Sequence, residues 1–347
     1  MLEIQFNWAF IVIVGAFILV FFSGIAIYQK SVSEKRYANN VLNQLESMFV
    51  SYGVISSSVS NLTLGNLEVI FDCENCYCNF RTSLDKESQG RSYKDAIIFA
   101  PRSIKGRKMM VLAEPWNAPF KVANFIYVTS PEVLYVFVYN KSDQMSISMK
   151  EKFSGDYNIL ASITKDFIDY TSLAAYKYNN NYKTRFVFLG IVPSKAKVNN
   201  SFIGKDFSAV YIEPASDFSN KARIAFYSSD SNGFRQVGKQ SYILGDASAY
   251  AAIFSEEQEA YDCNMDKAVE RISRLGILYS KRSEMIADSF GNGSCANIHR
   301  YSGFQMLANL SSFSSNVSQI SNAWKSIESR NMDTKGVGEL RRCPYLY

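Results

Sequence analysis

The hydrophobic pattern of the chain begins with one uninterrupted apolar run. No charged residue occurs from Ile4 to Gln29, and Phe6–Tyr28 supplies 23 mostly apolar residues. A transmembrane helix needs about 20 such residues, whereas a secretory signal has an apolar core of about 7–15 after a basic start. The run is longer than that and its start carries Glu3 but no Lys or Arg, so we expect residues 1–29 to form a transmembrane anchor. Gly24-Ile-Ala26 resembles a cleavage site and keeps a removed signal as the alternative.

An amphipathic pattern follows directly in residues 30–53. Apolar residues recur there every three or four positions and end at Gly53: Tyr37, Val41, Leu45, Met48 and Tyr52. Since no proline interrupts residues 6–52, the two patterns predict one continuous helix about 70 Å long. Its second half is expected to dock the apolar stripe on a head domain.

Residues 54–150 alternate short apolar runs with turn residues, which is typical of strands. The strand candidates are "LEVIFDC", "CNFRTS", "KMMVLAEPW", "FKVANFIYVTSP" and "VLYVFVYN". This part is therefore predicted to be a β-rich subdomain.

Residues 151–255 contain both the spacing of three or four residues that is typical of helices and short apolar runs that are typical of strands. Ile159, Ile163, Phe167 and Tyr170 predict a helix over 157–175, which with strands at 134–139 and 185–191 would form a βαβ unit. "SAVYIEP", "RIAFYSS" and "SYILGD" are further strand candidates, and Asn232-Gly233 is typical of a hairpin turn.

Residues 256–347 show the helical period. Ser255 with Gln258 predicts a capping box that opens a helix running to about Asp288, and a second helix is expected from about 303 to 330, antiparallel to the first. The fold class is therefore α+β, with a long N-terminal transmembrane helix, a β-rich subdomain, a mixed α/β middle and a C-terminal helical hairpin with a disulfide-tied tail.

The layout of the first 52 residues resembles type IV pilins and related archaeal surface proteins, in which a long N-terminal helix carries a β-rich head. A second resemblance covers four short segments: "QFNW", "EPWNAPFKVANFIYVTSP", "YDCNM" and "CPYLY". These are similar to uncharacterised single-span surface proteins of small-genome archaea. The first resemblance implies a filament subunit, and the second implies no known activity.

Six cysteines occur, and "CENCYC" places three of them at 73, 76 and 78. An even number favours disulfides in an oxidising compartment. Two alternatives stay open: a zinc site completed by Cys295 or His299, and free thiols. A C-x2-C redox site is a weaker alternative.

Helix geometry predicts one pairing. The 25 residues from Cys263 to Asp288 carry the chain about 38 Å, and the seven residues to Cys295 return it by at most about 25 Å. A Cys263–Cys295 bridge is therefore out of reach unless Gly276 breaks the helix. An antiparallel second helix would bring Cys343 to Cys263, leaving Cys295 for the cluster of Cys73, Cys76 and Cys78, whose other two members would pair with each other.

The orientation signals disagree. Lys30, Lys35 and Arg36 follow the run and place the head in the cytoplasm by the positive-inside rule. The cysteines favour the exterior, and a large domain translocates despite a modest charge bias, so we expect an extracytoplasmic head. Six sequons are candidate glycosylation sites, although chance accounts for about four: Asn61, Asn140, Asn199, Asn292, Asn309 and Asn316.

Charge and composition exclude several classes. The chain of 347 residues has a net charge of +5 with interspersed signs, which argues against a nucleic-acid binder. His299 is the one histidine, which disfavours His-based catalysis and His-rich metal sites. "GFRQVGKQ" resembles a phosphate-binding loop, but Gln240 replaces the hydroxyl and no helix is expected to follow.

We therefore expect a non-enzymatic, cofactor-free, single-pass surface protein. Its partners would be the lipid bilayer and proteins, or copies of itself, in an envelope assembly. The alternatives are a pilin-like filament subunit and a metal-binding or enzymatic domain.

Overall fold

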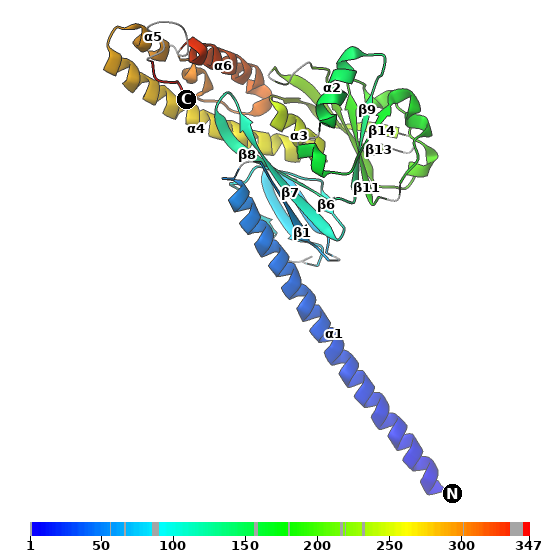
Figure 1. Cartoon of the computed structure of the whole chain (residues 1–347). Helices are drawn as coiled ribbons and strands as arrows, with labels where there is room; N and C mark the ends of the chain where they lie inside the picture. Colours follow the sequence, from blue (N-terminus) through cyan, green and yellow to red (C-terminus); the bar gives the residue numbers. More distant parts are fainter. Residues whose placement is uncertain are drawn as a thin grey trace.

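The protein consists of a long N-terminal helix and a head of three sheets and several helices, in an α+β arrangement as predicted (Figure 1). The computed structural model describes residues 2–347 except 56, 66, 85–89, 156–158, 180, 216–217, 219, 231–232, 301 and 334–342.

Helix α1 is continuous over Leu2–Tyr52, which confirms the predicted single helix. Its apolar first half lies outside the head, and its second half packs on the head (Figure 1). The predicted stripe is confirmed at Val41, Leu45 and Tyr52, which are buried. Ala38, Leu42 and Phe49 complete it, while Tyr37 is 41% exposed.

The part of the head beside α1 contains two four-stranded sheets. The first has the order β1-β7-β8-β5, with β1 Ser58–Thr63, β5 Ile98–Phe99, β7 Lys108–Asn117 and β8 Lys121–Thr129. The second has the order β4-β3-β2-β6, with β2 Val69–Glu74, β3 Tyr77–Thr82, β4 Arg91–Ser92 and β6 Ser103–Ile104. Both sheets share a hydrophobic core with the docked half of α1, so this helix is part of the head and not a separate linker.

A six-stranded sheet forms the middle of the head, with the order β10-β9-β11-β12-β13-β14. Its strands are β9 Val133–Tyr139, β10 Lys165–Asp169, β11 Lys183–Leu189, β12 Phe207–Ile212, β13 Ala222–Asp230 and β14 Gly233–Ile243. The first four are parallel, and β13 and β14 form an antiparallel hairpin. The hairpin was predicted, although residues 231–232 of its turn lie outside the described residues.

The predicted helix over 157–175 is wrong. Helix α2 (Gln144–Ser154) instead follows β9, and it is capped by Asp143, whose Oδ1 accepts the Met145 N–H at 3.1 Å. Residues 165–169 form β10, which pairs in parallel with β9, and Phe167 stacks on Phe137 at 4.9 Å between ring centroids. Strand pairing and this stacking therefore override the three-to-four-residue spacing. Short 3-10 turns lie on either side of β10, at Ile159–Ser162 and Tyr170–Ala175.

The C-terminal third is helical. It contains α3 Asp246–Phe254, α4 Gln258–Phe290, α5 Ser294–Arg300, a 3-10 turn at Phe304–Leu307, and α6 Phe313–Asp333. The predicted capping box is wrong: the Ser255 N–H bonds to the Ala251 carbonyl at the end of α3, and α4 begins after Glu257 without a side-chain cap.

The second long helix does not run antiparallel to α4, contrary to prediction. Gly276 packs closely against Leu307. A Cβ atom added to this glycine would lie only 2.7 Å from the Cβ of Leu307. Further along the chain, the Phe313 N–H donates to Asp266 Oδ1 at 2.7 Å. The segment 303–312 therefore returns the chain to the start of α4, and α6 then runs outward again in the same direction.

Candidate functional site

The N-terminal half of α1 has the dimensions of a membrane span. Within the described residues, α1 is the one helix that is long and apolar enough to cross a membrane, and an 18-residue window of it has a mean hydropathy of 2.9. Trp8 and Tyr28 stand near its two ends and are each 71% exposed. Twenty residues of helix separate them by about 30 Å, the thickness of the hydrocarbon core, and both residue types favour its interfaces.

Specific contacts join α1 to the head. Phe49 packs edge-on against Phe80, with ring centroids 5.3 Å apart, and Glu46 pairs with Arg91 at 2.6 Å. At the end of the helix, Asn124 Nδ2 donates to the carbonyl oxygens of Tyr52 and Ile55, each at 2.9 Å. The helix therefore enters the head at a defined position and angle.

The six cysteines form three disulfides: Cys73–Cys78, Cys76–Cys263 and Cys295–Cys343. The first closes the β2–β3 hairpin on itself. The second ties the turn of this hairpin to α4, and the third ties the C-terminal tail to α5. Two members of the 73–78 cluster thus pair with each other, as predicted, while Cys76 takes a different partner.

The predicted Cys263–Cys343 bridge is wrong because of the direction of α6. Since α6 runs the same way as α4, the tail leaves it at the far end of α4, where Cys295 lies. The tail is held there by more than the disulfide: Leu346 is fully buried, its N–H donates to Asn331 Oδ1 at 3.0 Å, and its carbonyl accepts from Arg282 Nη1 at 2.6 Å.

The metal and redox alternatives receive no support from the described residues. Among these residues no group of three or more His, Cys, Asp or Glu side chains has the spacing of a metal site. His299 is buried, its Nε2 lies 3.2 Å from the Pro344 carbonyl, and burial lowers its pKa. The C-x2-C cysteines bond to different partners, so they do not form a dithiol pair.

The structure places the six sequons in different environments. Asn61, Asn292 and Asn309 are exposed. Asn140 and Asn199 are half-buried, and the Asn199 amide donates to the Ala174 carbonyl at 3.1 Å. Asn316 accepts from the backbone and side chain of Ser311 at the start of α6. Glycosylation stays a prediction, and the exposed sites are the ones open to modification.

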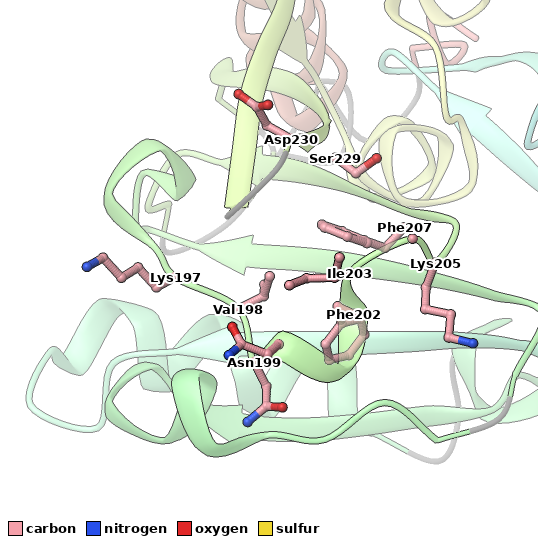
Figure 2. A pocket seen from close by; sticks show the side chains of 11 residues that line it. Lys197, Val198, Asn199, Phe202, Ile203, Lys205, Phe207, Ser229 and Asp230 are labelled. Atoms are coloured by element: carbon pink, nitrogen blue, oxygen red, sulfur yellow. The ribbon is translucent and has the colours of Figure 1, made fainter.

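Asn199 also lies in the wall of a cavity of about 590 Å³ (Figure 2). The crossover between β11 and β12 covers one side of the six-stranded sheet here, over an aromatic cluster that includes Phe202 and Phe207. Lys197, Lys205 and Asp230 stand at the rim, and Ile203 is 62% exposed. The arrangement is an open surface depression with mixed charge.

A cleft of about 1010 Å³ lies where Arg102, the residue before β6, meets the β12–β14 strands and the start of α4. Its basic residues are Arg102 and Lys239, and its acidic residues are Asp206, Glu256, Glu257, Glu259, Asp262 and Asp266. Burial raises the pKa of Glu257, Asp262 and Asp266. The cleft is therefore an acidic recess in which negative charge is partly desolvated.

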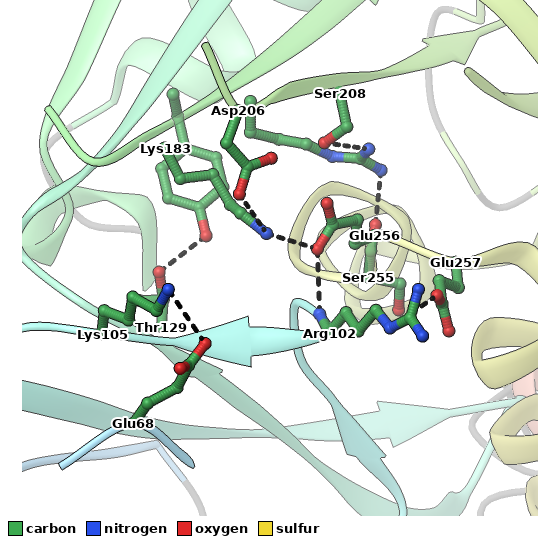
Figure 3. A network of polar contacts seen from close by, with 12 residues as sticks. Glu68, Arg102, Lys105, Thr129, Lys183, Asp206, Ser208, Ser255, Glu256 and Glu257 are labelled. Carbon is green, nitrogen blue, oxygen red and sulfur yellow. Dashed lines mark hydrogen bonds and ion pairs between the residues drawn. The ribbon is translucent and has the colours of Figure 1, made fainter. Parts of the chain in front are cut away.

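A network of ion pairs around the buried Lys183 adjoins this cleft (Figure 3). Lys183 Nζ lies 3.3 Å from Asp206 and 2.7 Å from Glu256. Burial opposes the charge of Glu256, but Lys183 and the Arg102 N–H hold its pKa below the usual value. Because Glu256 contacts both the second small sheet and the six-stranded sheet, it joins the main parts of the head.

Arg185 closes the end of α3 within the same region. Its guanidinium donates to the carbonyls of Ala252, Ile253 and Ser255 and to Ser208 Oγ. A cation at the carbonyl end of a helix is favourable. Burial lowers the pKa of Arg185 to about 10, and Glu256 opposes this shift.

Sequence reasoning did not find this buried network. The available signal was the alternation of Lys183 and Arg185 inside the otherwise apolar strand "KTRFVFL". The segment "GFRQVGKQ" lies within β14, which agrees with the rejection of a phosphate-binding loop there. Comparisons with models of known protein families, with curated proteins and with solved structures found no match.

Proposed function

We propose that this chain is a single-pass membrane protein whose head stands outside the cytoplasm and makes protein contacts in a larger assembly. The observation that carries the proposal is α1, in which one continuous helix exposes its apolar first half and buries its second half in the head core. The side chains of Trp8, Phe17, Val20 and Phe21 are more than half exposed. The lipid bilayer is the environment that best fits an apolar helical surface bounded by Trp8 and Tyr28.

Three disulfides support the extracytoplasmic orientation, because such bonds persist in oxidising compartments. The bases Lys30, Lys35 and Arg36 argue for the opposite side. We give the disulfides more weight because they involve every cysteine of the chain, and a large domain translocates despite a modest charge bias.

Contacts with proteins are the proposed role of the central cleft. Its carboxylates have structural partners: Asp262 accepts from Ser241 and Gln258, Asp266 accepts from the first N–H of α6, and Glu256 pairs with Lys183. Carboxylates fixed by hydrogen bonds and ion pairs are better suited to form a rigid acidic surface for a basic partner than to transfer protons. A pilin-like filament, in which copies of α1 pack together, is the alternative.

Alkaline extraction of membranes tests the anchor. We expect the full chain to stay with the membrane, and the double variant Ile18→Arg/Val20→Arg to be partly released, since each arginine costs about 2.5–3.5 kcal/mol near the centre of a span. Val50→Arg/Val54→Arg is the matched control, because Val50 and Val54 are 70% and 77% exposed but lie at the head. Release of the unchanged full-length chain would refute the anchor, and recovery of detergent-resistant polymers would favour the filament.

A further inference from the structure

The end of the head that faces the N-terminal half of α1 is formed by two neighbouring turns. Tyr37 on α1 donates its hydroxyl to the carbonyl of Thr63, the last residue of β1, at 3.2 Å. The next residue, Leu64, donates its N–H to the Arg107 carbonyl at 2.8 Å. The turn between β6 and β7 therefore lies level with Tyr37, where the helix enters the head.

This turn is close to the expected membrane surface. Nine residues of helix place Tyr37 about 14 Å beyond Tyr28, and the polar layer of a bilayer extends about 5–8 Å beyond the hydrocarbon edge. The remaining distance is comparable to the Debye length of about 8 Å at physiological salt. Charges on the turn therefore still act on the headgroups, at roughly a third to a half of their unscreened strength.

The side chains at this level are mainly basic. We use the name basic pole for Lys105, Arg107 and Lys108 on the turn together with Lys30, Lys35 and Arg36 on α1; all six are exposed. Three acids accompany them: Glu34 pairs with Lys30, Glu68 pairs with Lys105, and Glu132 accepts the Arg107 N–H. Within the part of the chain that the structure describes, no ion pair satisfies the side chains of Lys35, Arg36, Arg107 or Lys108.

We propose that the basic pole binds anionic lipid headgroups and seats the head on the membrane surface. The inference rests on the proposed anchor, and it adds a second, electrostatic membrane contact made by the head itself. Lysine and arginine side chains on a helix lean toward its N-terminus, so Lys35 and Arg36 reach back toward the bilayer. The exposed Leu84, which follows β3 and is 41% exposed, lies near the same end, since the neighbouring Ser83 N–H donates to the Glu68 carbonyl at 2.9 Å.

Lysine footprinting of the full chain in nanodiscs tests this. The chain is placed in phosphatidylcholine discs with and without phosphatidylglycerol and treated briefly with a water-soluble acylating reagent. We expect acylation of Lys108 to be slowed about fivefold by phosphatidylglycerol, in line with a gain of about 1 kcal/mol for each base near an anionic surface. Lys281, exposed on α4 away from the basic pole, serves as the internal control and should be unchanged. Salt of about 1 M should remove the effect.

Variants separate charge from shape. Arg36→Gln/Arg107→Gln should weaken the protection of Lys108 and move its rate toward that seen in neutral discs, whereas Arg36→Lys/Arg107→Lys should keep the protection. Arg274→Gln/Arg300→Gln is the matched control, because both arginines are exposed outside the basic pole. Equal Lys108 rates in the two kinds of disc would overturn the proposal while leaving the anchor intact. Failure of the chain to enter either disc would instead refute the anchor, and this inference with it.

Discussion

At the scale of single residues, the chain carries charges inside the head at a cost that neighbouring groups only partly offset. Lys267 on α4 lies over the Tyr93 ring at 4.7 Å, with the Tyr93 carbonyl and Asn264 Oδ1 each 3.4 Å from Nζ. Burial lowers its pKa to about 8, Arg271 lowers it further, and Asp95 opposes the shift. The pKa of a lysine in the unfolded chain is about 10.5, so it keeps its proton up to that pH.

This shift predicts how stability depends on pH. Between about pH 8 and 10 the unfolded chain binds more protons than the folded chain, so the free energy of unfolding contributed by Lys267 rises with pH. Below pH 8 both states are charged and the cost of burial is fully present. Above about pH 10 buried tyrosines such as Tyr127, whose pKa burial raises, reverse the trend. Lys267→Met should therefore stabilise the head by about 1–2 kcal/mol near neutral pH and flatten this rise.

Urea unfolding of the detergent-solubilised chain at two pH values measures both effects. Lys281→Met is the control, since Lys281 is exposed on the same helix and its removal should change little. A destabilised Lys267→Met variant would show that the contacts with Tyr93 and Asn264 outweigh the cost of burial.

At the scale of elements, the two halves of α1 are expected to respond differently to the same substitution. Leu45 is fully buried in the head core, whereas Leu19 is 70% exposed in the apolar run. Leu45→Ala should lower the free energy of unfolding of the head in detergent by about 2–4 kcal/mol, because it leaves a cavity. Leu19→Ala should change it by less than about 0.5 kcal/mol. Equal effects would contradict the assignment of 38–52 to the head core.

The elements that the sequence predicts well are those with a strong local period. The run at 6–28 and the stripe at 37–52 need no tertiary information, and neither do the long strands β7 and β8, which are bounded by turn residues. Helix α3 was missed because eight of its nine residues are buried, so "DASAYAAIF" has no polar face. Residues 165–169 were misassigned because their pairing with β9 depends on a partner about 30 residues earlier.

At the scale of the whole molecule, the candidate site could not be predicted because it too depends on residues that are far apart in the sequence. The central cleft and the buried network combine Arg102, which precedes β6, with residues of β11, β12, β13, β14 and the start of α4. Arg185 gains its role only when α3 is placed against the sheet, and Lys183 gains its role only when Asp206 and Glu256 are brought beside it. The disulfide error has the same origin, since it depended on the direction of α6, which is set by the packing of Leu307 on Gly276.

The orientation of the head leads to a prediction about the cysteines in living cells. If the head is extracytoplasmic, a membrane-permeant alkylating reagent added before lysis should label no cysteine. Non-reducing peptide mapping should then recover the peptide that contains Cys73, Cys76 and Cys78 joined to the Cys263 peptide, and Cys295 joined to Cys343. Protease added to cells with a permeable envelope should remove the head and leave cytoplasmic markers intact.

A head kept reduced in the cytoplasm would expose Cys76 first, because Cys76 is the exposed member of its cluster, whereas Cys73 and Cys78 are buried. Alkylation of Cys76 together with full protection from protease would therefore reverse the proposed topology and agree with the bases that follow the span.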